Sequence, residues 1–473
     1  MSDSKIFAQK PYFVYFVATI GALGGLLFGF DTGVIAGALL FIQKTFYLTT
    51  FLKEIIVSSV VVGALLSSLL SGKLADYFGR RFMLMFAAIA FIIGTLLATF
   101  AFNPACLILG RLVIGLAIGI SSYTVPLFIS EMAPAKHRGA LVLLNAITIT
   151  SGQAAAFLVD YYFSDTGAWR YMFAVGLIPA TLLFIGMLYS PSTPRWLVLK
   201  GATDKARETL QRIRANHNVE EELQAIRESF SLKKAHWGFL FSRYLRPVLL
   251  IGLGLGILQQ GVGINTVMYY GPTIFKQAGF EQASSQILAT FGMGLVNTIM
   301  SILAVFIVDK IGRRKLLLIG SAMAGIGLLF VGYHFHLQEE TSWLRWFALG
   351  GLIFYIAGYC LSVGSLFWLI IAEIYPLSIR GQAMSFVTAV QWGANFLVTI
   401  SFLTIIQAIG AAYTLWLYAV MCVICFLFAY FFVPETCGVS LETIEKNLAL
   451  DKPARELGQP LNQDSPCGLE VTR

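Results

Sequence analysis

Two charged residues lie inside long apolar stretches of the sequence. Asp31 lies well inside the stretch 12–40, and Arg111 lies near the start of the stretch 105–129. If these stretches cross a membrane, each isolated charge costs about 2.5–3.5 kcal/mol at the bilayer centre, so each needs a partner. The simplest partner of either residue is the other one. Such a pair can take up a proton when the two side chains separate and release it when they pair again. The alternative interpretation is a fixed salt bridge that joins the two stretches and takes no part in proton transfer.

Polar amide and indole groups are also spread over the apolar stretches. A sugar presents a ring of hydroxyls and two apolar faces, so its site needs amides, which both donate and accept, beside an aromatic ring. Gln259 and Gln260 precede Asn265 by six and five residues, and Tyr269 follows it by four. The period of a continuous helix would place all four on one broad face, although any single one could equally bond to another helix. The candidate set is Gln153, Gln259, Gln260, Asn265, Tyr269, Asn297, Trp368, Gln391, Trp392 and Asn395.

The composition predicts that lipid surrounds the elements that carry these residues. Of the 473 residues 57% are hydrophobic and 12% are charged, whereas a soluble chain has about 25% charged residues. The net charge of +8 does not indicate nucleic-acid binding, because the chain has no basic face with few apolar neighbours. Twelve apolar stretches of membrane-crossing character are found, at 12–40, 54–72, 83–102, 105–129, 139–163, 169–190, 247–275, 284–308, 316–334, 343–374, 382–408 and 412–433.

One long polar insertion divides the stretches into two sets of six. Apolar residues recur in it every three or four positions over 203–230, which predicts short amphipathic helices on the cytosolic face of the membrane. Of the 33 Lys and Arg residues, 27 fall on the side of the N-terminus and five on the other, so both termini and the insertion are expected in the cytosol. The expected units are a six-helix half at 1–194, a linker at 195–246, a second half at 247–433 and a tail at 434–473.

The two halves repeat a pattern of charged residues. Asp76-Tyr-Phe-Gly-Arg-Arg recurs 233 residues later as Asp309-Lys-Ile-Gly-Arg-Arg, and the pair Glu131 and Arg138 recurs 242 residues later as Glu373 and Arg380. Two copies of one six-helix unit are typical of secondary transporters, in which one half tilts against the other around a fixed site. Carboxylates and arginines at the helix ends could form a gate on the cytosolic side, or they could be positive-inside charge without a moving role. The gate candidates are Asp76, Arg80, Arg81, Glu131, Arg138, Arg195, Asp309, Arg313, Arg314, Glu373, Arg380 and Glu435.

These motifs resemble those of the sugar porters of the major facilitator superfamily over nearly the whole chain. Further matches are Phe28-Gly-Phe-Asp-Thr, Ser130-Glu-Met-Ala-Pro, Gln259-Gln-Gly-Val-Gly-Ile-Asn and Pro434-Glu-Thr. The sequence departs from the family pattern at Ser192, where the signature Pro-Glu-Ser-Pro-Arg has Glu, and at Cys437, where Pro-Glu-Thr-Lys-Gly has Lys. Both departures fall at the expected cytosolic gate.

The resemblance implies an all-α membrane protein of twelve helices with the major facilitator fold, arranged as two six-helix repeats with short cytosolic helices between them. It implies import of a monosaccharide with a proton, because the proton-linked members have an Asp at the position of Asp31. The family's sugar-contacting positions match Gln153, Gln259, Gln260, Asn265, Asn297, Trp368 and Asn395, and Gln391 is aligned less closely.

Other functions remain open or are excluded by the residues. A passive sugar uniporter, a proton-coupled inositol symporter and a membrane nutrient sensor would share most of these features, and the residues leave open which sugar is carried. We expect no enzymatic activity, cofactor, metal site, nucleic-acid partner or cleaved signal peptide, and a monomer in a bacterial inner membrane. Cys422 and Cys425 have a ligand-like spacing, but no His or carboxylate lies near them in the sequence.

Overall fold

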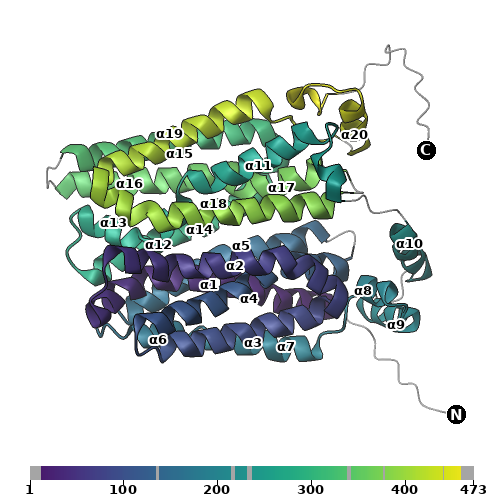
Figure 1. Ribbon diagram of the computed structural model, residues 1–473, viewed down its shortest axis with the longest axis horizontal. Coiled ribbons are helices and arrows are strands. Elements are labelled where there is room, and N and C mark those ends of the chain that lie inside the picture. Colours follow the sequence, from purple (N-terminus) through teal and green to yellow (C-terminus); the bar gives the residue numbers. More distant parts are fainter. Residues whose placement is uncertain are drawn as a thin grey trace.

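The computed structural model describes residues 12–134, 138–214, 219–231, 237–337, 342–376, 379–439 and 441–459. These residues are almost entirely helical, and the long helices run side by side in two bundles (Figure 1). The first bundle contains α1 (Tyr12–Phe46), α2 (Thr50–Phe78), α3 (Arg80–Thr99), α4 (Pro104–Met132), α5 (Arg138–Tyr162), α6 (Trp169–Ala174) and α7 (Leu177–Tyr189). The second contains α11 (Arg246–Gly261), α12 (Ile264–Tyr269), α13 (Gly271–Gln277), α14 (Ala283–Ile311), α15 (Arg313–Leu337), α16 (Ser342–Tyr359), α17 (Ser365–Ile374), α18 (Arg380–Ile409) and α19 (Ala411–Phe432).

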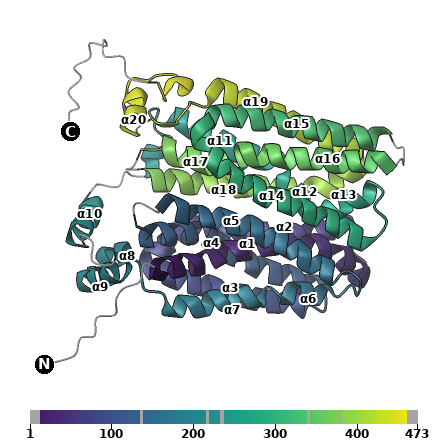
Figure 2. The ribbon, with the colours of Figure 1, turned by 180° about the vertical axis from the view of Figure 1, so that it is seen from behind.

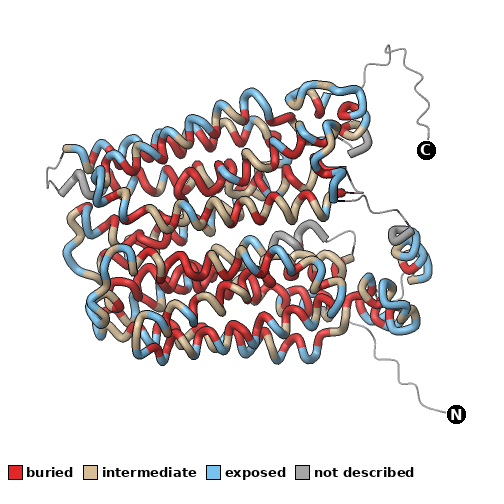
Figure 3. The backbone as a smooth tube through the Cα atoms, viewed as in Figure 1, coloured by how far each residue is buried: buried red, intermediate tan, exposed pale blue. Residues whose placement is uncertain are grey.

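Most of these helices suit a lipid environment. Within the described residues, eleven helical segments are long and apolar enough to cross a membrane, and each overlaps one of eleven of the twelve predicted stretches. The remaining stretch, 139–163, coincides with α5, some of whose side chains lie outside the described residues. Large apolar side chains such as Leu69, Phe86 and Ile93 are roughly half exposed, and exposed positions recur along the long helices (Figure 3). The chain is therefore a multi-pass membrane protein.

Three of the predicted stretches are broken rather than continuous. The stretch 169–190 is divided into α6 and α7, 247–275 into α11, α12 and α13, and 343–374 into α16 and α17. Gly263, with a φ of +84°, separates α11 from α12, and Ser362 has the non-helical angles φ −107° and ψ −123° in the π-helical turn between α16 and α17. The single helical face proposed for residues 259–269 was therefore wrong, because the helix ends between the two glutamines and Asn265.

Short helices occupy one end of the two bundles, which we call the linker end; the opposite end is the far end. α8 (Pro194–Leu199), α9 (Thr203–Arg214), α10 (Val219–Ser231) and α20 (Leu441–Ala449) all lie at the linker end (Figures 1 and 2). The predicted apolar face of α9 is buried at Ala206, Leu210 and Ile213. Arg214 then donates hydrogen bonds to the carbonyls of Met132 and Ala133, at 2.8 and 3.0 Å, and so attaches α9 to the last turn of α4.

Candidate functional site

Asp31 of α1 and Arg111 of α4 face each other inside the first bundle. One guanidinium nitrogen, Nη1, lies 3.3 Å from Asp31 Oδ1, and Arg111 is fully buried while Asp31 is 5% exposed. Arg111 Nε donates a second bond, of 2.8 Å, to the carbonyl of Ile56 on α2. Asp31 Oδ2 and Arg111 Nη2 have no hydrogen-bond partner. The pair is thus joined by one long bond and leaves one carboxylate oxygen available to a proton.

A small cavity adjoins Asp31. Its volume is about 10 Å³, which is close to the least space that holds a single water molecule. Asp31 and Thr95 are polar residues in its lining, and Phe30, Ile114 and Phe173 supply apolar wall. One water there would reach the carboxylate from within the first bundle.

Several candidate amides of the second bundle form a connected network. Asn265 Nδ2 donates to Gln260 Oε1 at 2.7 Å, and Gln260 Nε2 lies 3.5 Å from Gln259 Oε1. Gln391 of α18 donates to the same Gln259 oxygen at 3.1 Å. The break at Gly263 therefore does not scatter these side chains but brings Asn265 back onto the glutamines.

The irregular turn between α16 and α17 provides acceptors for this network. Gln259 Nε2 lies 3.3 Å from each of the carbonyl oxygens of Val363 and Gly364. Carbonyls freed by a helix break must be satisfied inside the protein when the helix lies in a membrane. The two broken helices are thus joined where their backbones depart from regular geometry.

One hydrogen bond joins the amides of the two bundles. Asn297 Nδ2 of α14 donates to Gln153 Oε1 of α5 at 3.0 Å, and both side chains are buried. Asn297 Oδ1 in turn accepts from the thiol of Cys360 at 3.0 Å. An aromatic contact also crosses between the bundles, since the rings of Phe28 and Trp392 lie 5.8 Å apart.

The remaining sugar-site candidates differ in their surroundings. Tyr269 and Asn395 are each 1% exposed, and Asn395 accepts a hydrogen bond from Thr399 at 3.0 Å. Trp368 on α17 is 42% exposed and packs edge-on against Phe367, so the structure does not bring it into the amide network.

At the linker end, the first bundle carries one of the predicted ion-pair clusters. Arg80 Nη2 lies 3.0 Å from Asp76 and 3.1 Å from Glu131, which places the guanidinium between the ends of α2 and α4. Arg81, by contrast, donates to the carbonyls of Met187 and Leu188 at the end of α7, at 2.9 and 2.7 Å.

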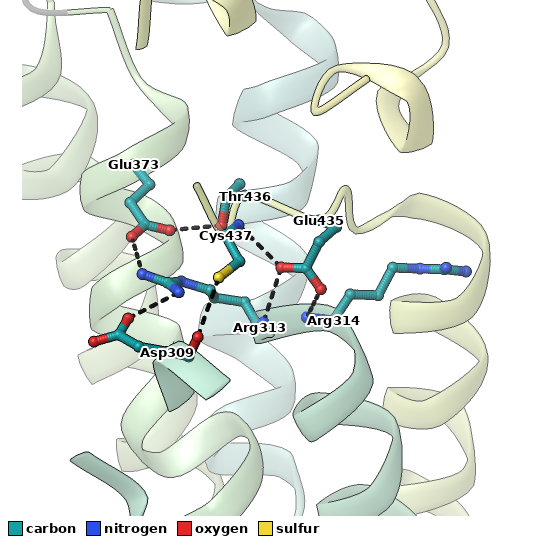
Figure 4. Close-up of polar contacts among 7 residues, drawn as sticks. All are labelled: Asp309, Arg313, Arg314, Glu373, Glu435, Thr436 and Cys437. Carbon is teal, nitrogen blue, oxygen red and sulfur yellow. Dashed lines mark hydrogen bonds and ion pairs between the residues drawn. The ribbon is translucent and has the colours of Figure 1, made fainter. Parts of the chain in front are cut away.

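The second bundle carries the matching cluster (Figure 4). Arg313 lies 3.0 Å from Asp309 and 2.9 Å from Glu373. Glu435 accepts hydrogen bonds from the backbone N–H groups of Arg313 and Arg314, at 2.9 and 3.1 Å, and so caps α15. The two departures from the family pattern do not remove either cluster, and Cys437 itself donates its N–H to Glu435 at 3.0 Å.

Other gate candidates are placed less centrally. Arg314 Nη2 donates a hydrogen bond of 2.7 Å to the carbonyl of Tyr430, and Arg380 Nε donates one of 3.1 Å to the carbonyl of Tyr375. Arg195 is exposed on α8, but its charge interacts with that of Glu131 in the first cluster. The side chain of Arg138 lies outside the described residues, so its predicted correspondence to Arg380 stays a prediction.

Sequence reasoning gave no site role to three polar residues that make important contacts. Thr436 donates to Glu373 at 2.5 Å, and its position directly after Glu435 was a signal that could have found it. Asp160 is fully buried on α5 and accepts from the N–H of Gly37 at 3.0 Å. Glu54 is also fully buried, but it stands at the edge of an apolar stretch and was read only as its boundary.

Membrane-spanning helices in two bundles, with buried polar groups where the bundles meet, define a membrane transport protein. A family model described as "Sugar (and other) transporter" matches residues 17–448. The chain belongs to this family, the sugar porters of the major facilitator superfamily, whose members are transporters and not enzymes.

Relatives and solved structures agree with this assignment. The chain is 40% identical to the arabinose-proton symporter of Escherichia coli strain K12 over 94% of its own length and 95% of that protein. It is 40% identical to the galactose-proton symporter of the same strain over 94% and 96%. The partially occluded inward-open conformation of the xylose transporter XylE from E. coli superposes with a TM-score of 0.80 at 30% identity, covering 90% of this chain and 99% of that one.

Proposed function

We propose that this chain imports a monosaccharide together with a proton by alternating access in a bacterial cell membrane. Membership of the sugar transporter family and the proton-symporter relatives support this proposal. The observation that carries the proton step is the buried, singly bonded pair of Asp31 and Arg111. The carrier has twelve membrane helices, with halves at 1–194 and 247–433.

The linker end faces the cytosol in this proposal. The excess of Lys and Arg on that side, 27 against five, is the charge distribution that sets the orientation of membrane proteins. The linker 195–246 and the tail 434–473 are then cytosolic, as are both ion-pair clusters.

Protonation of Asp31 is the coupling step. A neutral carboxyl attracts Arg111 less strongly, while the guanidinium keeps its bond to the carbonyl of Ile56. α1 is then free to move relative to α4. α1 also packs closely on α5, because a Cβ at Gly29 would overlap the carbonyl oxygen of Ile149. Movement of α1 would therefore shift α5 and its residue Gln153.

The sugar binds where the amides now bond to one another. Its hydroxyls would replace bonds such as that between Asn297 and Gln153, so opening the network exchanges one set of hydrogen bonds for another. A sugar between these two residues would be held by both halves, which lets binding favour closure of the carrier. Removing one contacting amide should cost about 1–3 kcal/mol if a hydroxyl is left unpaired.

The proton gradient provides the energy of accumulation. The membrane potential supplies about 2.3 kcal/mol per charge per 100 mV, enough for roughly fifty-fold accumulation of sugar with one proton. No described residue takes part in ATP hydrolysis in this scheme.

The first prediction tests the coupling residue. Asp31→Asn should abolish sugar-driven alkalinisation of the medium and protonophore-sensitive accumulation, while labelled sugar still exchanges across the membrane, because the amide cannot release a proton. The test is uptake of labelled glucose, galactose, xylose, arabinose and inositol by cells or proteoliposomes, with and without a protonophore. It measures proton-linked accumulation and sugar exchange, and it also identifies which of these compounds is carried.

A matched control is Asp165→Asn, which makes the same change at an exposed position and should leave coupling intact. Accumulation that persists in Asp31→Asn would refute the coupling role. Wild-type flux that ignores the protonophore would instead indicate a passive uniporter.

A further inference from the structure

A buried carboxylate at the far end joins the two halves. Glu54 lies in the first turns of α2, and its side chain is fully buried. Its Oε1 accepts from the backbone N–H of Thr404 on α18, and its Oε2 accepts from the hydroxyl of the same residue, both at 2.7 Å. Both carboxylate oxygens are therefore bonded to one residue of the opposite half (α2 and α18 are labelled in Figure 1).

A second contact follows the same faces of the two helices toward the far end. Gln407 Nε2 lies 2.5 Å from Thr50 Oγ1. Residues four apart on α2 and three apart on α18 share a helix face, so these side chains form one continuous seam. We call the bonds of Glu54 and Thr404 the far-end contact.

The ion pairs at the linker end have a different geometry. Arg80 bonds to Asp76 and Glu131 of its own half, and Arg313 bonds to Asp309 and Glu373 of its own half. These bonds can persist while the halves tilt. The far-end contact cannot, because opening of the far end must separate α2 from α18.

Hydrogen bonds that involve a charged group are worth more than neutral ones when they form in a dry site. A carboxylate buried without partners is unfavourable, and one surrounded by water is stable again. Glu54 therefore has two good environments, one in the closed far end with Thr404 and one in a hydrated, open far end. A side chain with these properties suits a switch between two states.

We propose that Glu54 is the gate residue of the far end, holding α18 through Thr404 while the carrier is closed to the outside. The role of a gate rests on the proposed transport cycle, but the test of this inference measures the conformation of the protein and not transport. Glu54 is a positioning residue, because its hydrogen bonds go to Thr404 and not to Asp31 or to any candidate sugar-binding residue.

The second prediction concerns Glu54→Gln. An amide oxygen can still accept from the Thr404 N–H, and the amide NH2 can turn to donate to the Thr404 hydroxyl, but neither bond then involves a charged group, so both are weaker than those of the carboxylate. In hydrogen–deuterium exchange of the full-length protein in nanodiscs, far-end amides of α2 and α18 should exchange about tenfold faster, as expected for loss of a charge-assisted hydrogen bond. Amides of the linker end should exchange more slowly, because outward opening closes the opposite side.

Matched variants separate gating from damage to the fold. Thr404→Val removes only the hydroxyl and should give a smaller shift in the same direction, whereas Thr404→Ser keeps the hydroxyl and should behave as wild type. Glu281→Gln makes the same change at an exposed far-end position and should have no effect. The effects of Glu54→Gln and Thr404→Val should not add, since they break one contact.

Two outcomes would overturn the proposal. Unchanged far-end exchange in Glu54→Gln would show that the contact does not hold the gate, and equally faster exchange at both ends would show general destabilisation. Neither outcome bears on proton coupling, which depends on Asp31. A failure of the transport assay in the wild type, with the exchange shift intact, would instead refute the proposed function alone.

Discussion

The ion-pair clusters of the two halves share one plan but differ in a single carboxylate. In each, an arginine bonds to an aspartate four residues earlier and to a glutamate of another helix, with distances of 3.0 and 3.1 Å around Arg80 and 3.0 and 2.9 Å around Arg313. Glu435 caps α15 in the second half. In the first half α3 has no side-chain cap among the described residues, and Ser192 stands at the position that corresponds to Glu435 in the repeat.

The two helix junctions show how the missing carboxylate is replaced. Gly79 and Gly312 have φ angles of +94° and +95°, which a residue with a Cβ rarely adopts. A Cβ at Gly312 would come within 2.6 Å of Glu435, whereas one at Gly79 would come within 2.8 Å of the Trp196 ring. Trp196 donates to the carbonyl of Asp76 at 3.1 Å. The same space is thus filled by a carboxylate in one half and by an indole of the linker in the other.

The largest effect is expected from removing the cap. Glu435→Gln should destabilise the first turn of α15 by about 1–2 kcal/mol, because two backbone N–H groups lose a charged acceptor. Hydrogen exchange of the amides at the start of α15 measures the change. Ser192→Ala is the matched change in the first half and should alter the start of α3 much less. Equal effects in the two halves would contradict the asymmetry.

An intermediate effect is expected from restoring the carboxylate in the first half. Ser192→Glu should stabilise the first turn of α3 by about 0.5–1 kcal/mol, since an acidic group near a helix N-terminus is favourable. Slower exchange of the amides at the start of α3 would demonstrate the new cap. No gain would indicate that the Trp196 ring occupies the place that the carboxylate needs.

The smallest effect is expected at an exposed pair of the same end. Arg207 on α9 bonds to Glu220 on α10, with Nε and Oε1 2.5 Å apart, and this bond lowers the pKa of Glu220. A lowered pKa means that the contact stabilises the α9–α10 pairing above the usual pKa of a glutamate and loses this effect as the pH falls through the lowered value. Exchange in α10 should therefore rise only in acid, and Glu220→Gln should leave sugar uptake unchanged. A loss of uptake would assign this exposed pair a role in the cycle.

Much of the fold could be predicted because the bilayer imposes simple rules. Length and hydrophobicity located the spans, and the separation of charges marked the two repeats. The pairing of Arg80 with Glu131 followed from motifs that occur twice. Breaks such as that at Ser362 could not be predicted, since an irregular backbone in a membrane depends on a partner such as Gln259, which comes from a different helix.

The candidate sites divide in the same way. Asp31 and Arg111 were evident from sequence because a charge inside an apolar stretch is costly whatever surrounds it. Glu54 was not, because a charge at the edge of a stretch can equally face water. Asp160 lies inside a predicted stretch and could have been noticed by the same criterion as Asp31.

The sequence by itself determined that this is a membrane protein, that it contains two related halves, and that Asp31 and Arg111 are charges within apolar stretches. These properties depend only on the composition and the order of residues along the chain. Only the tertiary structure decided which buried groups meet across the halves, as Glu54 meets Thr404 and Gln153 meets Asn297. Such contacts depend on the register between helices far apart in sequence, and a shift of one helical turn would exchange every partner.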